Sequence, residues 1–216
     1  GWWNTIEIAD LNADGRPDLV LGNEGLNSRL RPEPGRPLLL FAADFDDNGS
    51  VDPLHAFYEG EKIYPVTNRE AIVRQLPHLK KKYLRTTPFA NATVEEILGG
   101  QAMANAKRYE VNELHSLVYY NLPGGWQRSA LPVIAQQSPV RDLLVKDFDT
   151  DGQPDILLVG NDWGTEVETG RYDAGNGVLL LNKGVGQWRV VENRESGFWA
   201  SMDARGLLPL DLADGK

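Results

Sequence analysis

Three nine-residue segments of the chain repeat the pattern Asp-x-[Asp/Asn]-x-[Asp/Asn]-Gly-x-x-Asp, and they begin at Asp10, Asp44 and Asp147. Short carboxylate and amide side chains at alternate positions of a tight loop can converge on Ca²⁺, a hard cation with six to eight oxygen ligands. Glycine at the sixth position supplies the backbone angles of the turn. Without a cation, carboxylates held this close would repel one another. The pattern therefore predicts three calcium loops, named here loop one, loop two and loop three.

The predicted ligands are the side chains at positions one, three, five and nine, together with the backbone carbonyl at position seven. They are Asp10, Asn12, Asp14, Arg16 and Asp18 in loop one, Asp44, Asp46, Asn48, Ser50 and Asp52 in loop two, and Asp147, Asp149, Asp151, Gln153 and Asp155 in loop three. Asp, Asn and Gly also cluster in ordinary turns. Three segments that match at five positions favour calcium over that simpler explanation, and we expect about three Ca²⁺ ions per chain.

The residues around the loops indicate strands rather than helices. After loops one and three come the short apolar runs 19–21 and 156–159, each followed by glycine, which is typical of buried strands. Position twelve, where an EF-hand carries a bidentate glutamate, is Leu21, His55 or Leu158. The repeated unit is therefore strand, loop, strand, and this excludes the EF-hand and dockerin-type modules.

A second repeated element follows further along the chain. Asn121 and Trp126 enclose a glycine-containing turn after an apolar run, and Asn182 and Trp188 do the same 61 to 62 residues later. Each segment predicts a β-hairpin with an aromatic side chain on the returning strand. The same step from loop three reaches residues 211–214, interpreted as a shortened loop remnant without a metal. A period of roughly 60 residues with about four strands is typical of propeller blades.

These loops and hairpins resemble the FG-GAP/VCBS repeats that form the β-propeller of integrin α subunits and of many secreted bacterial proteins. The resemblance covers residues 1–60 and 115–216. Segments 65–70, 76–83 and 168–173 are also similar to bacterial VCBS-repeat proteins related to the ASPIC/UnbV and cartilage acidic protein group. The resemblance implies structural calcium sites and a propeller surface used for adhesion or recognition. Catalysis is not the usual role of that family.

The spacing of the loops departs from a regular propeller. Loops one and two are 34 residues apart, loops two and three are 103 apart, and 216 residues provide roughly 3.5 blades. We therefore predict an all-β fold: a partial β-propeller of roughly three to four blades with a small α-helical insertion. The predicted division is blades over 1–66, the insertion over 67–113 and blades over 114–216. Open sheet edges of an incomplete ring could pair between chains and give a homo-oligomer.

The predicted insertion shows helical signals. Segments 67–70 and 93–96 fit capping boxes, and Pro77 is expected to open the second of two short helices. A third helix should end at Gly99-Gly100. The apolar residues at one helical face are Ile72, Leu76, Leu79 and Tyr83. Lys80, Lys81 and Lys82 are more simply a solvated face than a docking surface for a partner.

Composition narrows the function classes. The formal net charge is −9, with 31 acidic and 22 basic residues, which disfavours nucleic-acid binding because that needs a basic surface. The absence of cysteine excludes disulfides and thiolate metal sites. No apolar run reaches the length of a membrane span, so membrane insertion is not expected. No signal peptide is visible in this chain, and calcium dependence favours a secreted, periplasmic or cell-surface location.

A long polar and aromatic segment, residues 160–173, is the candidate for ligand binding. Its candidate contact residues are Trp163, Glu166, Glu168, Arg171, Tyr172 and Asp173, residue types suited to protein or glycan contacts. The alternative is a connecting loop in which Arg171 pairs with a neighbouring acid.

The functional prediction is a calcium-stabilised, non-catalytic recognition or adhesion module with a protein or glycan ligand. Two alternatives stay open: the propeller domain of a polysaccharide-processing enzyme, or a passive spacer in a large surface protein.

Overall fold

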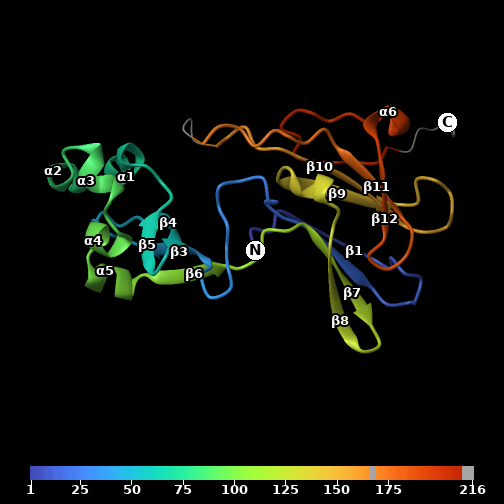
Figure 1. Ribbon diagram of the computed structural model, residues 1–216, viewed down its shortest axis with the longest axis horizontal. Coiled ribbons are helices and arrows are strands. Elements are labelled where there is room, and N and C mark those ends of the chain that lie inside the picture. Colours follow the sequence, from blue (N-terminus) through green and yellow to red (C-terminus); the bar gives the residue numbers. More distant parts are fainter. Residues whose placement is uncertain (166–168, 211–216) are drawn as a thin grey trace. The chain divides into compact units, whose positions relative to one another are not determined.

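The computed structural model describes residues 1–165 and 169–210 (Figure 1). The chain divides into two compact units. Residues 30–113, together with Gly1, form one of them, which we call the inserted unit. Residues 2–29 and the chain from residue 114 onward form the other, which we call the outer unit. Each unit is described by itself.

The outer unit contains two four-stranded antiparallel sheets. The first has the strand order β1-β2-β7-β8: β1 is Thr5–Ala9, β2 Asp18–Gly22, β7 Leu117–Leu122 and β8 Gly125–Ala130. The second has the order β12-β11-β10-β9: β9 is Val140–Lys146, β10 Asp155–Gly160, β11 Val178–Asn182 and β12 Trp188–Val191. A 3-10 turn, Val133–Gln136, connects the sheets, and the short helix α6, Asn193–Ser196, follows β12. The predicted antiparallel β architecture is confirmed at this level.

In the sequence, the inserted unit lies between β2 and β7, which pair with each other in the first sheet. Hydrogen bonds join the two segments of the outer unit that flank the insertion. Gly25 N donates to Leu114 O (2.8 Å), and Asn23 N donates to Ser116 Oγ (3.0 Å). Gln136 accepts from Ser116 N at 2.8 Å. The irregular loop spacing has a topological cause, because loop two belongs to the inserted unit. The predicted boundary between residues 66 and 67 falls inside that unit, which begins near residue 30.

The core of the outer unit lies between its two sheets. Side chains alternate between the faces of a strand, and the inward ones form a buried apolar cluster with members on both sheets. Val20, Val118 and Tyr120 contribute from the first sheet, and Ile156 and Leu180 from the second; all five are 0% exposed. The apolar runs read from the sequence as strands therefore supply this core.

Gly160 ends β10 where another segment passes very close. A Cβ atom at this position would lie 1.7 Å from the backbone oxygen of Pro139. Gly22, at the corresponding end of β2, would place a Cβ 2.8 Å from a side-chain carbon of Val140. Close backbone packing therefore requires the glycine at residue 160, whereas a side chain at residue 22 would have to displace the side chains of Thr5 and Val140.

The inserted unit contains a third antiparallel sheet, of order β5-β4-β3-β6. Its strands are β3, Leu38–Ala43; β4, Asp52–Glu59; β5, Lys62–Pro65; and β6, Lys107–Val111. Loop two joins β3 to β4. The first three strands form a continuous meander, whereas β6 returns to the free side of β3.

Five short helices lie between β5 and β6: α1, Arg69–Gln75; α2, Leu79–Lys82; α3, Thr86–Ala90; α4, Val94–Leu98; and α5, Gly100–Asn105. The predicted apolar face is confirmed, since Ile72, Leu76, Leu79 and Tyr83 are buried in a cluster with side chains of β3 and β4. Lys80, Lys81 and Lys82 are exposed. None of the helices described here has the length and apolar character of a membrane span.

Two details of the helix predictions need correction. The capping residue of α1 is Asn68, whose side chain accepts from Ala71 N, and not Thr67. Pro77 precedes α2 without opening it. The second capping box is present as predicted, between Thr93 and Glu96. The helical part is also more broken than expected, because short turns separate five helices where three were predicted.

Candidate metal centres

The three loops have one backbone conformation. Each joins two antiparallel strands, β1 to β2, β3 to β4, and β9 to β10. The fourth residue has a left-handed φ of about 60°, at Ala13 (56°), Asp47 (57°) and Thr150 (61°). The glycine at position six is also left-handed, with φ of 82°, 87° and 87° in loops one, two and three. The sequence pattern predicted the glycine but not the strained residue two positions earlier.

The first carboxylate of each loop closes the turn. Its Oδ2 atom accepts a hydrogen bond from the backbone N–H of the glycine at position six. The distances are 2.8 Å from Gly15 to Asp10, 2.7 Å from Gly49 to Asp44 and 2.9 Å from Gly152 to Asp147. The hydrogen bond from Gly49 is the main cause of a lowered pKa of Asp44. That carboxylate is therefore ionised at neutral pH.

The carboxylate at position nine lies at the base of each loop. Asp18 and Asp155 are 0% exposed and Asp52 is 5% exposed. Each accepts a hydrogen bond from the backbone N–H of position two, with distances of 3.0 Å from Leu11, 3.0 Å from Phe45 and 2.8 Å from Phe148. This contact holds the two ends of the loop together in all three copies.

In the outer unit the same carboxylate also reaches a third strand. Asp18 accepts from Asn121 N at 2.7 Å, and Asp155 accepts from Asn182 N at 2.8 Å. In loop two the neighbouring strand β5 ends opposite Ala56, so it cannot supply the equivalent donor. The position-nine residues of loops one and three therefore have a structural role in addition to the predicted one.

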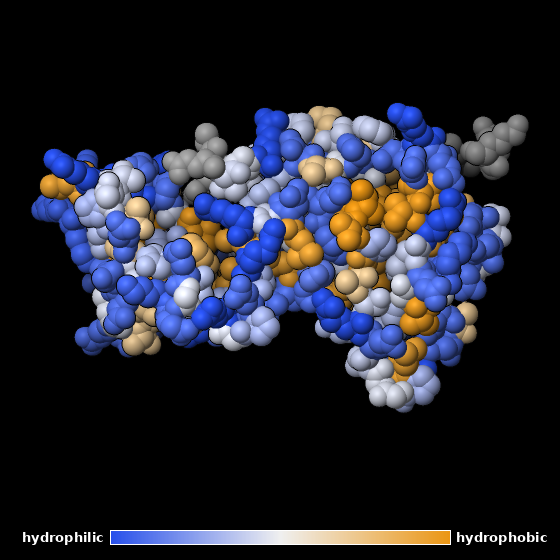
Figure 2. Space-filling view, viewed as in Figure 1, coloured by the Kyte–Doolittle hydropathy of each residue, from blue (hydrophilic) through white to orange (hydrophobic). Residues whose placement is uncertain are grey.

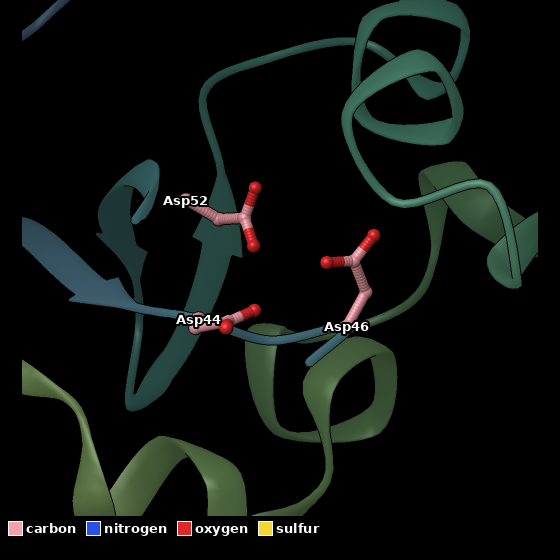
Figure 3. Close-up of side chains that lie close together, drawn as sticks. All are labelled: Asp44, Asp46 and Asp52. Atoms are coloured by element: carbon pink, nitrogen blue, oxygen red, sulfur yellow. The ribbon is translucent and has the colours of Figure 1, made fainter. Parts of the chain in front are cut away.

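Two acidic groups converge closely enough to hold a metal ion. In loop two they are Asp44, Asp46 and Asp52, and in loop three Asp147, Asp149 and Asp151; within each group, one oxygen from each residue lies within 4.8 Å of the others. Figure 3 shows the three carboxylates of loop two facing a common space next to the β3–β4 turn. Loop two thus combines positions one, three and nine, and loop three combines positions one, three and five.

One oxygen in each of these groups lacks a partner. Asp46 Oδ1 and Asp147 Oδ1 are buried from solvent and accept no hydrogen bond in the part of the chain that is described. A buried, unpaired carboxylate oxygen is costly, and a hard divalent cation is a ligand that would satisfy it. The donor set, with only carboxylate, amide and carbonyl oxygens, therefore fits Ca²⁺.

Loop one differs from the other two. Its third position is Asn12, whose Nδ2 donates to Asp14 Oδ2 at 3.0 Å. Arg16 Nη2 also contacts Asp14 Oδ2, at 2.7 Å. The pKa of Asp14 is lowered, chiefly by the hydrogen bond from Arg16. A guanidinium group is thus the present counter-ion of this loop.

Loop three carries a lysine that the sequence pattern did not reveal. Lys183 follows the last residue of β11, and its Nζ lies 2.7 Å from Asp151 Oδ2 and 3.3 Å from Asp149 Oδ2. The hydrogen bond from Lys183 is the largest cause of a lowered pKa of Asp151. The same contact raises the pKa of Lys183. Residue 183 lies 32 residues beyond Asp151, so no local motif could have identified it.

The predicted hairpins are confirmed. Asn121 lies directly opposite Trp126 in the β7–β8 pair, and Asn182 lies opposite Trp188 in the β11–β12 pair. Asn182 is 1% exposed, and its Nδ2 donates to Leu11 O of loop one at 2.7 Å. This asparagine therefore connects loop one to the second sheet.

The candidate recognition segment is held at its base by Asn161. This buried residue has a φ of 83° and exchanges hydrogen bonds of 2.9 Å with the backbone of Gly175. Within the segment, the guanidinium carbon of Arg171 lies 4.5 Å from the ring centre of Trp163. Tyr172 pairs with Asp162 through two backbone hydrogen bonds.

The structure describes only one of the three remaining predicted contact residues. Asp173 is exposed, whereas Glu166 and Glu168 lie outside the described residues. The stacked pair Trp163 and Arg171 is the part of the segment that the structure brings together, and Trp163 remains 36% exposed.

A separate cavity of about 310 Å³ lies beside β11, β12 and α6 in the outer unit. Trp199, 63% exposed, lines it together with Val190, Glu192, Arg194 and Asn176. Figure 2 shows apolar atoms at the surface over the region where β11 and β12 lie in Figure 1. The volume of this cavity is within the range of small-molecule sites, and its mixed apolar and polar lining suits an amphipathic ligand.

Comparison of the chain with protein-family models, curated proteins and solved structures found no match.

Proposed function

We propose that this chain is a calcium-stabilised, non-catalytic recognition module. The observation that carries the proposal is the threefold loop with identical hydrogen bonds at positions one and nine, in which two copies leave a buried carboxylate oxygen unpaired. Repetition of the same backbone geometry favours a shared ligand over three independent turns. Calcium is the cation best matched to this all-oxygen donor set.

The chain's own residues would supply the site as follows. Position one closes the turn, position three presents a free oxygen in Asp46, and position nine fixes the base of the loop in the adjacent strand. A bound divalent cation would neutralise the mutual repulsion of these carboxylates. Because each loop joins two paired strands of a sheet, the free energy of binding would add directly to the stability of that sheet.

The family proposal is an FG-GAP/VCBS-type partial β-propeller. Two four-stranded antiparallel meanders with calcium loops between their first two strands support it. We further propose an extracytoplasmic location, since sites of modest affinity, about 10⁻⁴–10⁻³ M, are suited to extracellular calcium.

The proposed ligand is a protein or a glycan, and two surfaces of the outer unit could contact it. One is the stacked pair Trp163 and Arg171, and the other is the cavity beside Trp199. Arrays of glycans and of extracellular proteins should be screened with the intact chain in calcium. Loss of a binding signal in Trp163→Ala or in Trp199→Ala, with unchanged melting temperature, would assign the ligand to one surface.

Thermal unfolding tests the stabilising role of calcium. Chelation should lower the melting temperature of the intact chain, and millimolar Ca²⁺ should restore it, whereas equal Mg²⁺ should restore less because Mg²⁺ prefers a smaller, rigid octahedral site. Melting that is insensitive to chelator and calcium would remove the basis of the proposal.

A further inference from the structure

We infer that Lys183 and Arg16 are tethered cations that weaken calcium binding to loops three and one, so that loop two binds calcium most tightly. The inference rests on the proposed function, because it concerns the order in which the same three loops fill. It identifies two basic residues outside the predicted side-chain ligands as determinants of affinity.

The position of Lys183 is fixed by the fold. The residue before it, Asn182, donates its backbone N–H to Asp155 at the base of loop three. This contact holds the start of the β11–β12 turn beside the loop. From there the Lys183 ammonium group reaches Asp151 at 2.7 Å and Asp149 at 3.3 Å. It therefore lies against two of the side chains that a cation in loop three would use.

Lys183 does not pair with every carboxylate oxygen of loop three. Asp147 Oδ1 remains buried and without a hydrogen-bond partner, although Asp149 and Asp151 are both paired with the lysine. The lysine side chain is 43% exposed, so it can move into solvent when a divalent ion enters. It is a competing counter-ion rather than a permanent substitute for the metal.

Arg16 has the same relation to loop one by a local route. It occupies position seven, and its Nη2 lies 2.7 Å from Asp14 Oδ2. Only its backbone carbonyl is a predicted ligand, so the side chain can be changed while that oxygen is kept. The two outer-unit loops thus each hold one basic side chain against a ligand carboxylate.

Loop two has no such counter-ion. Its position seven is Ser50, and across residues 1–165 and 169–210 no basic side chain forms an ion pair with Asp44, Asp46 or Asp52. The lowered pKa of Asp44 comes mainly from the backbone N–H of Gly49. A cation entering loop two displaces no charged group of the protein.

The difference in charge predicts a graded affinity. An entering divalent ion must break the Lys183 or Arg16 pair and then remain near a positive charge. Because these pairs are partly exposed and screened by solvent, removal of one should lower the calcium Kd of its loop by about two- to fivefold.

Calcium titration calorimetry on the intact chain tests the inference. Wild type should show one tighter and two weaker sites, and Asp44→Ala should remove the tighter one. Lys183→Met should raise the calcium affinity of one of the two weaker sites. The double variant Lys183→Met with Asp147→Ala should lack that site, which assigns it to loop three. Arg16→Met should tighten the other. Lys183→Arg, which keeps the charge, should remain close to wild type.

Lys81→Met is the control for net charge, because Lys81 is exposed on α2 in the inserted unit; it should leave all three affinities unchanged. If the three sites of the wild type bind calcium with equal affinity, and Lys183→Met leaves these affinities unchanged, this inference alone is overturned. If none of the loops binds calcium, both this inference and the proposed function are overturned.

Discussion

Asp155 accepts a hydrogen bond from the backbone N–H of Asn182 at 2.8 Å, across the sheet from the loop to which Asp155 belongs. Its second oxygen accepts from Phe148 N at 2.8 Å, and the carboxylate is fully buried. Loop one repeats the relationship between Asp18 and Asn121. The last residue of the loop pattern therefore also joins the loop to its own strand and to the neighbouring strand.

Asp155→Ala should destabilise the outer unit even without calcium. It would remove one buried and one part-buried hydrogen bond, and hydrogen bonds to a charged group contribute about 1.5–3 kcal/mol each, so the expected loss is about 3 kcal/mol. Urea unfolding in EDTA measures it. Gln153→Ala, in the same loop, should cost less than about 0.5 kcal/mol. Equal effects of the two substitutions would contradict the structural role of Asp155.

Gly160→Ala should be strongly destabilising because a Cβ would meet the backbone oxygen of Pro139 at 1.7 Å. Overpacking against backbone is expected to cost at least about 2 kcal/mol. Gly124→Ala is the matched control, since a Cβ there has no neighbour within 4 Å. Chemical unfolding of both variants should show a large loss of stability for the first and a small change for the second.

The stability of the inserted unit should fall below pH 6.5 because of His55. Burial lowers the pKa of this histidine from its ordinary value of 6.5. The unfolded chain therefore binds the proton first, so the stabilising effect is complete above the unfolded pKa and decreases as the pH falls through 6.5.

Unfolding measured between pH 7.5 and pH 5.5 should be less pH-dependent in His55→Gln than in wild type. His78→Gln, at an exposed position, should behave as wild type. An unchanged pH dependence in His55→Gln would show that other groups are responsible.

Replacement of residues 30–113 by a short Gly/Ser linker should leave the outer unit folded. Its buried cluster contains no residue of the inserted unit, and the hydrogen bond from Gly25 N to Leu114 O holds the two cut ends together. The shortened chain should unfold cooperatively in calorimetry and retain two calcium loops. A molten or unfolded product would show that the outer unit depends on the insertion.

Local patterns predicted the parts of this fold that are determined locally. The loop pattern located three hairpins, and the Asn121 and Asn182 segments located two more. The spacing of Ile72, Leu76, Leu79 and Tyr83 identified the buried helical face. Each of these signals depends on residues close in sequence. The periodicity of the strand or helix determines which of their side chains share one face.

Contacts between residues distant in sequence had no signal in the local patterns. The helical segment predicted over 67–113 is part of a larger compact unit that begins near residue 30 and also contains β3 to β6. The contacts of Lys183 with Asp149 and Asp151, and of Asn182 with Leu11, join residues 32 to 171 positions apart. Such pairs follow from sheet packing and have no local sequence signature.

The number of calcium ions bound by the intact chain tests the central claim most directly. Equilibrium dialysis against millimolar Ca²⁺ with metal analysis should find about three equivalents, and Asp44→Ala and Asp147→Ala should each bind one fewer, since each removes position one of a loop. Binding of no calcium by the folded wild-type chain, or an undiminished equivalent count in both variants, would contradict the account.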